Sequence, residues 1–194
     1  MNCPQEQLRT AMLLGCDAVE RLRSARVAVF GVGGVGGYAC EALARAGVGA
    51  IDLFDRDVIS LSNINRQIIA LHSTVGRPKV EVMKERGVNA RLVNFFDETF
   101  QEQFDTILMA MNGIGIVGRL EALPNYFMRV KQLLAPGGQV LLDSSDIRYV
   151  FEDEDGNLEL DPENGYYGEL DYRMQYRGIK GEKFDWLYID FDTL

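Results

Sequence analysis

Up to residue 146, runs of consecutive apolar residues alternate along the chain with stretches in which apolar residues recur every three or four positions. The first pattern is typical of strands buried on both faces of a parallel sheet, and the second of helices that cover such a sheet. Glycines that follow these stretches predict where they end. The pattern predicts helices at 4–23 (interrupted at Gly15), 34–47, 74–86 and 118–134, and strands at 26–31, 50–55, 90–96, 104–111 and 139–145.

Strands that alternate with helices favour right-handed crossovers and a doubly wound sheet. The predicted fold class is therefore α/β, with a Rossmann-like, doubly wound, mostly parallel sheet and an "APGG" turn before its last strand. After Asp146 the pattern changes to short alternating runs around "DEDG" and "GIKG". It predicts an antiparallel β-hairpin extension near the C-terminus, with one hairpin in 147–160 and two further strands in 166–189.

Composition narrows the class of protein. The chain has 194 residues, 47% of them hydrophobic, which suits one domain with a substantial core. No apolar run reaches the ~18 residues that cross a bilayer, and the start of the chain lacks a signal-peptide pattern, so we expect a cytoplasmic protein without membrane contact. Cys3, Cys16 and Cys40 are odd in number and lack C-x-x-C spacing. We therefore expect reduced thiols, with Cys40 on a helix face.

Charge is distributed unevenly: residues 1–90 carry a net +2 and residues 91–194 a net −11, which sum to −9. An acidic protein gains little from counterion release on nucleic acid, so an RNA contact would need a local basic face. The candidates for such a face are Arg9, Arg21, Arg23 and Arg26. The same arginines fit more readily the solvated side of an amphipathic helix. The acidic run 152–155 similarly fits a solvated hairpin tip better than a metal site.

A glycine-rich turn, "AVFGVGGVGG", joins the first predicted strand to its helix and contains Gly31, Gly33, Gly34 and Gly36. Bare backbone amides and a helix N-terminus at such a turn can receive a phosphate. Asp55 ends the second strand, where a carboxylate can accept hydrogen bonds from ribose hydroxyls. The residues indicate an adenine nucleotide; the alternative is a tight strand-to-helix turn without a ligand.

The next stretch, "DRDVISLSNINRQIIALHSTVGRPK", is more specific. With the glycine turn and "RTAMLLG", residues 8 to about 86 resemble the ThiF, or ubiquitin-activating-like, superfamily, and within it the tRNA threonylcarbamoyladenosine dehydratase branch. The resemblance implies ATP and Mg as cofactors, and adenylation of a tRNA-borne carboxylate. It places Asp55 on the ATP ribose and Asn63, Arg66 and Lys79 near the phosphates. It also implies a nucleotide, tRNA and a second copy of the chain as partners.

The residue types suit this chemistry, because fixed cations stabilise the charge that builds on the phosphate oxygens when a carboxylate attacks the α-phosphate. Arg66 supplies a planar fork of donors and Lys79 a point charge, so these two are the catalytic candidates. The alternative is that both are ordinary surface side chains. His72, the only histidine, could act as a general base, but within "ALHST" it fits better a role in packing or in capping a turn.

The resemblance to ThiF proteins breaks at the end of the fourth predicted strand. The superfamily places there an aspartate that binds the magnesium ion bridging the ATP phosphates, whereas this chain has Met109, Met111 and Asn112. Asn112 alone is a poor ligand, since Mg²⁺ usually takes one or two carboxylates with the phosphates. We therefore identify no metal-ligating residue, and an adenylating enzyme without turnover is one of the expectations. No cysteine follows Cys40, so the sulfur chemistry of the superfamily is not expected either.

From about Val80 the chain instead resembles class I S-adenosylmethionine-dependent methyltransferases, in "ERGVNARLVNFFDETF", "FDTILMAMNGIG" and the stretch from "LLAPGGQVLLDSS" onward. This resemblance implies S-adenosylmethionine as an alternative cofactor, with Asp97 on the adenine amine and Asn112 at the methyl-transfer site. Asp97 equally suits a helix cap. The glycine-rich cofactor turn of that family is missing from this half, and the chain ends at Leu194 where the family continues, so we expect a truncated second half.

The two resemblances predict a single hybrid Rossmann-like domain joined near residues 80–86. Its parts are a ThiF-like nucleotide-binding segment (1–86), a methyltransferase-like segment (87–146) and the hairpin extension (147–194). Three functions remain open: ATP-dependent adenylation, methyl transfer with the cofactor held by the glycine turn, and a non-catalytic nucleotide-binding or structural module. ATP binding ranks first because its motifs are complete through Lys79.

Overall fold

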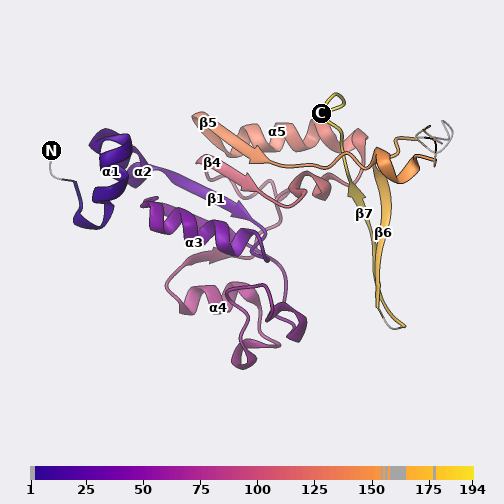
Figure 1. Cartoon of the computed structure of the whole chain (residues 1–194), viewed down its shortest axis with the longest axis horizontal. Helices are drawn as coiled ribbons and strands as arrows, with labels where there is room; N and C mark the ends of the chain where they lie inside the picture. Colours follow the sequence, from indigo (N-terminus) through magenta and orange to yellow (C-terminus); the bar gives the residue numbers. More distant parts are fainter. Residues whose placement is uncertain (1–2, 154, 156, 158–164, 177) are drawn as a thin grey trace. The chain divides into compact units, whose positions relative to one another are not determined.

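The structure is a computed structural model, which describes residues 3–153, 155, 157, 165–176 and 178–194. Its chain divides into two compact units, whose elements are shown in Figure 1. We call them the sheet unit, Met1–Ala110 with Val130–Leu141, and the hairpin unit, Met111–Arg129 with Leu142–Leu194. This division does not test the hybrid organisation expected from the sequence, which stays a prediction.

A five-stranded sheet forms the centre of the sheet unit, with the strand order β3-β2-β1-β4-β5. Central β1 pairs in parallel with β2 and β4, and β2 pairs in parallel with β3. The arrows of β1, β4 and β5 point the same way in Figure 1. The doubly wound, mostly parallel sheet is therefore confirmed. The strands are β1 (Arg26–Phe30), β2 (Ala50–Phe54), β3 (Asn89–Arg91), β4 (Phe104–Met109) and β5 (Leu134–Leu142).

Glycine and proline set the ends of the helices. Gly15 (φ 85°) separates the first two helices, and Gly47 (φ 89°) ends the third, because both adopt backbone conformations that side chains disfavour. Pro124 is tolerated in the first turn of α5, where its missing N–H has no helical partner to lose. The helices are α1 (Leu8–Leu14), α2 (Cys16–Ser24), α3 (Gly36–Ala46), α4 (Lys79–Glu85) and α5 (Leu123–Leu133).

Short 3-10 turns connect many of these elements. They are η1 (Gln5–Gln7), η2 (Leu61–Asn63), η3 (His72–Thr74), η4 (Gly113–Val117), η5 (Leu120–Ala122) and η6 (Arg148–Phe151). None of the helices in the described part of the chain has the length and apolarity that a membrane crossing requires.

Three predicted boundaries in the sheet unit are wrong. The helix predicted from Thr74 begins only at Lys79, because Pro78 disfavours helical backbone in the residue before it. The strand predicted at 90–96 ends at Arg91, since the Asn94 side chain accepts the Phe96 N–H and forms a turn. The "APGG" turn lies within β5. A Cβ at Gly138 would stand 3.0 Å from the carbonyl oxygens of Phe104 and Asp105, so the missing side chain allows this segment to lie against β4.

The thiol prediction is wrong for two of the three cysteines. Cys3 and Cys16 form a disulfide across a Cα–Cα distance of 5.8 Å, because Cys16 begins α2 directly after the break at Gly15 and faces the start of the chain. Cys40 is free and half-buried in α3, as expected. Burial raises the pKa of its thiol to about 11.

The antiparallel extension is confirmed in the hairpin unit, where β6 (Glu169–Tyr176) pairs with β7 (Ile179–Leu187). The hairpin predicted at 147–160 is different: Arg148–Phe151 forms the 3-10 turn η6, and residues 154, 156 and 158–160 lie outside the described residues. Asp153 accepts the backbone N–H groups of Asp155 and Asn157.

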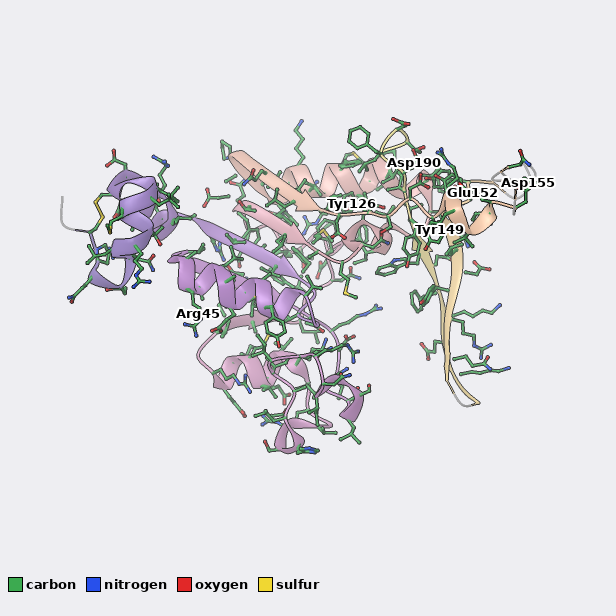
Figure 2. All side chains as sticks on the ribbon, viewed as in Figure 1. Arg45, Tyr126, Tyr149, Glu152, Asp155 and Asp190 are labelled. Atoms are coloured by element: carbon green, nitrogen blue, oxygen red, sulfur yellow. A yellow bond between two sulfur atoms is a disulfide. The ribbon has the colours of Figure 1, made fainter. Side chains whose placement is uncertain are left out.

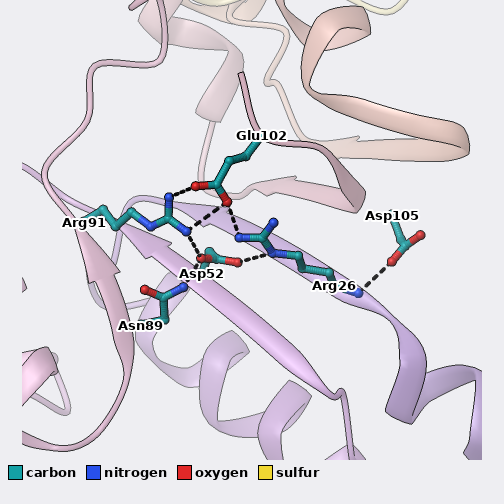
Figure 3. Close-up of polar contacts among 6 residues, drawn as sticks. All are labelled: Arg26, Asp52, Asn89, Arg91, Glu102 and Asp105. Atoms are coloured by element: carbon teal, nitrogen blue, oxygen red, sulfur yellow. Dashed lines mark hydrogen bonds and ion pairs between the residues drawn. The ribbon is translucent and has the colours of Figure 1, made fainter. Parts of the chain in front are cut away.

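A polar network joins the strands of the sheet unit (Figure 3). The Asp52 carboxylate, 1% exposed, lies 2.7 Å from Arg26 Nε and 2.8 Å from Arg91 Nη2. Asn89 also donates a hydrogen bond to it, and both guanidinium groups bind Glu102. Because this network occupies the Arg26 guanidinium, Arg26 does not contribute to a basic face for RNA. Arg9, Arg21 and Arg23 remain exposed on α1 and α2.

The network makes a testable contribution to stability. Hydrogen bonds from Arg91 and then Arg26 lower the pKa of Glu102 from 4.5 to about 2. A lowered folded-state pKa stabilises the fold above pH 4.5, and this contribution is lost as the pH falls from 4.5 towards 2. We expect Glu102→Gln to lower the free energy of unfolding at neutral pH by about 1 kcal/mol, a value reduced for the partial exposure of the side chain.

Urea unfolding at a series of pH values measures this effect, with the exposed Glu98→Gln variant as the control. The stability difference between wild type and Glu102→Gln should shrink over that acidic window. A difference that stays constant down to the lowest pH would contradict the assigned role of Glu102.

Candidate functional site at the glycine-rich loop

The glycine-rich loop lies at the carboxyl end of β1, between this strand and α3. With the strand order 3-2-1-4-5, the chain changes direction across the sheet between β1 and β4, which is where ligands bind in open α/β sheets. Two glycines are required by the turn itself. Gly31 has a φ of 91° and donates its N–H to the Phe54 carbonyl, and a Cβ at Gly36 would stand 1.9 Å from the Gly31 carbonyl oxygen.

Gly33 has no such requirement. Its φ lies outside the left-handed region, and a Cβ built there would meet only the Gln67 amide nitrogen, at 4.0 Å. A Cβ at Gly34 would lie 3.4 Å from Arg66 Cγ, an ordinary contact. Neither packing nor backbone conformation therefore explains why position 33 is glycine. The close approach of a ligand to the backbone would explain it.

An unsatisfied polar atom lies beside this loop. Gln67 is 8% exposed, and its Oε1 has no hydrogen-bond partner among the described residues. Leaving a buried acceptor unpaired costs about 1–3 kcal/mol, so an N–H or O–H of a ligand that reached it would be favoured. Gln67 could not be identified from the sequence, because a glutamine in a polar stretch carries no signal of where its side chain lies.

Asp55 fixes the loop to two other segments. Its side chain is 5% exposed, and Oδ2 accepts both the Val32 N–H (2.7 Å) and a hydrogen bond from Lys79 Nζ (2.9 Å). Oδ1 accepts the Asp57 N–H at 2.8 Å. Lys79 is 2% exposed and lies 2.9 Å from a second carboxylate, that of Asp57. The structure thus brings together the predicted residues Asp55 and Lys79, and adds Asp57, which the sequence analysis missed.

Local pairing explains how Lys79 reaches this place. The Lys79 N–H donates to the Asp57 carbonyl at 2.9 Å, and the Ile59 N–H donates to the Arg77 carbonyl at 2.9 Å. Val58 and Pro78 form an isolated antiparallel bridge between the same two segments. The start of α4 is therefore held against the chain that leaves β2, and its first side chain points at the Asp55 carboxylate.

Arg66 and Asn63 have different environments. Asn63 is 8% exposed, and its Oδ1 accepts the Ser60 N–H at 2.9 Å, so its carbonyl oxygen stabilises the turn η2. Arg66 is exposed and donates to the Ser62 carbonyl and the Asn65 side chain. No carboxylate in the described part of the chain pairs with Arg66. Its charge therefore lies next to Gly34 without an acid, available to an anion.

Two other predicted candidates lie apart from this arrangement. His72 is exposed at the start of η3, and the cap of this turn is Thr74, whose Oγ1 accepts the Leu71 N–H. Asp97 is exposed, and its Oδ1 accepts the backbone N–H and the hydroxyl of Thr99. These bonds stabilise a turn, and the described structure has no helix between β3 and β4, so the helix-cap alternative for Asp97 is wrong.

The residues after β4 offer no magnesium site. Met109 is buried in the sheet unit, whereas Met111 and Asn112 belong to the hairpin unit. The Asn112 amide donates to the Leu187 carbonyl at 3.0 Å and accepts the Ser144 hydroxyl at 3.1 Å. Where residues are described, no group of three or more acidic, histidine or cysteine side chains could hold a metal ion. These donors do not fit Mg²⁺.

The buried ion pair predicts a difference between two neighbouring aspartates. Asp55→Asn leaves the buried Lys79 ammonium with one carboxylate and weakens the anchor of the loop, so it should lower the free energy of unfolding by about 3 kcal/mol. Asp57→Asn removes a carboxylate that is 61% exposed, and should cost less than about 1 kcal/mol. Urea unfolding of both variants measures the difference; equal stabilities would show that Asp55 does not anchor the loop.

Known proteins match the part of the chain that contains the glycine-rich loop, Asp55 and Lys79. The model of the ThiF family matches residues 5–110. A tRNA threonylcarbamoyladenosine dehydratase from Bacillus subtilis (strain 168) is 46% identical over 105 residues, which cover 50% of this chain and 41% of the relative. The solved structure of E. coli tRNA N6-threonylcarbamoyladenosine dehydratase in complex with AMP is similar with 31% identity and a TM-score of 0.56, over 73% of this chain and 59% of that one.

A second kind of relative also matches. A SAM-dependent methyltransferase from Bacteroides fragilis, solved in complex with S-adenosyl-L-homocysteine, is 46% identical with a TM-score of 0.64, over 90% of this chain and 64% of that one. The resemblances to both families are therefore confirmed. The chain spans less than two thirds of the length of each of these three relatives. Since the matched residues 5–110 make up more than half of the sequence and contain the glycine-rich loop, Asp55 and Lys79, the chain belongs to the ThiF family.

Proposed function

We propose that the chain binds ATP at the glycine-rich loop, as a ThiF-type relative of the tRNA threonylcarbamoyladenosine dehydratases. The observation that carries the proposal is Gly33, a glycine that the protein's own packing and backbone conformation do not require. The orphaned acceptor of Gln67 and the unpaired charge of Arg66 beside the same loop support it.

Each part of the site has a task in this proposal. Backbone N–H groups at positions 33 and 34 and the N-terminus of α3 receive phosphate oxygens, since they combine free donors with the positive end of the helix dipole. Arg66 adds a charged fork that suits phosphate. Asp55 holds the loop through Val32, and its Oδ1 accepts one described hydrogen bond, so a lone pair is left for a ribose hydroxyl.

We propose binding of ATP and not turnover, because the residues of the site do not supply every group that adenylation needs. Bound ATP supplies an α-phosphate that a carboxylate can attack, and the charge on it is opposed here by Arg66. Lys79 is already shared between Asp55 and Asp57, so it orients the site more than it neutralises a phosphate. Because no described set of donors fits Mg²⁺, we propose ATP binding without assigning turnover. The exposed Arg9, Arg21 and Arg23 are the residues proposed to contact tRNA.

Single substitutions in the loop test ATP binding. Gly33→Ala should leave the free energy of unfolding unchanged but weaken ATP binding at least about tenfold, since a methyl group takes the space of the phosphate. Arg66→Ala should weaken ATP binding by a similar factor through the loss of a charged hydrogen bond worth about 1.5–3 kcal/mol. Isothermal titration calorimetry with ATP measures both effects.

A matched variant serves as the control. Arg45→Ala removes an arginine from the last turn of α3, away from the glycine-rich loop that precedes this helix (Figure 2). It should bind ATP like the wild type. Unchanged affinity in Gly33→Ala and Arg66→Ala would sink the proposal.

Methyl transfer is a second candidate, favoured by the similarity to the Bacteroides fragilis methyltransferase over 90% of this chain. In this proposal the glycine turn and Asp55 hold S-adenosylmethionine, and Asp97 hydrogen-bonds the adenine amine. The same titration with S-adenosylmethionine in place of ATP distinguishes the two. Saturable binding that Asp97→Ala weakens would favour methyl transfer, whereas binding indifferent to Asp97 would count against it.

A further inference from the structure

The hairpin unit contains a pocket of about 410 Å³, within the usual size range of small-molecule sites. Its lining combines aromatic rings from β6, β7 and the residue after β7 with polar groups from the segment after β5. The residues that carry the argument are Asp143, Ser145, Tyr172, Phe184, Trp186 and Tyr188. None of them takes part in the glycine-loop site.

Strand geometry explains why the rings gather here. Phe184, Trp186 and Tyr188 follow one another at every second position, so their side chains emerge on the same face of the chain. Tyr172 on β6 is the direct partner of Phe184 on β7. Gly115 in η4 makes room for the indole, because a Cβ there would stand 2.2 Å from Trp186 Cε2. The position of Trp186 therefore depends on this glycine.

The rings enclose space because their planes are not parallel. Tyr172 and Phe184 are tilted by 44° with centroids 5.4 Å apart, and Phe184 and Trp186 meet edge-on at 84° and 5.9 Å. A flat ligand such as a nucleobase could stack on one of these faces, but the rings form no parallel slot that would hold it from both sides. Faces that point in different directions instead suit a compact cation, which is attracted to the face of each ring that it approaches.

The polar side of the pocket carries the matching charge. Asp143 Oδ2 accepts the Asn112 N–H at 2.8 Å, while its Oδ1 has no partner in the described part of the chain. The lining includes no lysine or arginine among the residues that the structure describes. Asp143 is exposed and lines the same pocket as the rings, without a cation of the protein to pair with it.

The backbone beneath the pocket is strained and fixed. Met111 and Asn112 both adopt left-handed conformations, at φ 67° and 57°, which residues other than glycine seldom do. Three hydrogen bonds hold Asn112 there, to Asp143, Ser144 and the Leu187 carbonyl. Strain that is held in this way is commonest at binding sites, where it fixes the groups that meet a ligand.

We propose that this pocket binds an organic ammonium ion, with its alkyl groups against Tyr172, Phe184 and Trp186 and its charge opposite Asp143. Ring faces at several angles, an unpaired carboxylate oxygen and the lack of a competing basic side chain select this class of ligand. This pocket uses none of the residues of the proposed nucleotide site, and its proposal does not rest on that site.

The chain's single tryptophan gives a direct readout, because Trp186 lines the pocket. Tryptophan fluorescence of the full chain is titrated with choline and with its neutral isostere 3,3-dimethyl-1-butanol, at constant ionic strength. We expect a saturable change with choline and an affinity for the neutral alcohol lower by about fivefold, since Tyr172 and Phe184 are 39% and 41% exposed and a cation–π contact at an exposed site is worth up to about 1 kcal/mol.

Two variants measure separately how much the carboxylate charge and the aromatic rings contribute to choline binding. Asp143→Asn keeps an acceptor for the Asn112 N–H but removes the charge, and Tyr172→Leu keeps an apolar wall but removes a ring face. Each should weaken choline binding at least about fivefold, and circular dichroism checks that the fold is retained. Tyr149→Leu replaces an exposed tyrosine (labelled in Figure 2) that does not line the pocket, and this variant should bind choline like the wild type.

Three results would overturn the proposal: equal affinity for choline and its neutral isostere, full retention of choline binding in Asp143→Asn, or no saturable change with choline. A stronger and saturable response to adenosine would also overturn it, in favour of a stacking site for a nucleobase.

Discussion

The Asp55 carboxylate is the contact on which the candidate site depends. Asp55 directly follows β2, holds the glycine-rich loop after β1 through the Val32 N–H, and pairs with Lys79 at the start of α4. A parallel sheet places the carboxyl ends of its strands along one edge. Asp55 connects the segment after β1 to the segment after β2 through hydrogen bonds at this edge. Burial makes this tie effective, because with the Asp55 and Lys79 side chains 5% and 2% exposed, water competes little for either charge.

A second polar cluster stabilises the sheet independently. Asp52 lies on β2 only three residues before Asp55, yet it binds Arg26 and Arg91 and takes no part in the glycine-loop site. Cross-strand ion pairs along β1, β2 and β3 therefore hold the sheet together without using the groups of the loop. The site can therefore contain the unpaired Arg66 and the unsatisfied Gln67 acceptor, while the charged side chains of the sheet network are paired with one another.

Much of the fold could be predicted from local patterns, and the exceptions have local causes. Buried strands β1, β2 and β4 read as apolar runs, and Gly15 and Gly47 mark helix ends through their positive φ values. The pattern failed where a single polar or proline residue redirects the backbone, as Pro78 and Asn94 do. It also failed at the Cys3–Cys16 disulfide, because counting cysteines says nothing of the 5.8 Å that separates their Cα atoms.

The candidate site was predictable only in part, for a different reason. The glycine spacing identified the loop, but only the structure shows that Gly31 and Gly36 serve the turn while Gly33 does not. The partners of Asp55 and Asn112 lie 24 and 75 residues away in sequence. Residues such as Asp57, Gln67 and Trp186 acquire their roles through contacts of this kind, which no short-range pattern encodes.

The central claim is that the backbone at position 33 is open because a nucleotide phosphate approaches it. Two-dimensional ¹H–¹⁵N NMR of the labelled chain, titrated with ATP, observes this contact at the atoms concerned. The account predicts saturable shifts of the Gly33 and Gly34 amide signals, while those of Gly15 and Gly178, outside the loop, stay in place. Saturating ATP that leaves the signals of the loop unmoved would contradict it.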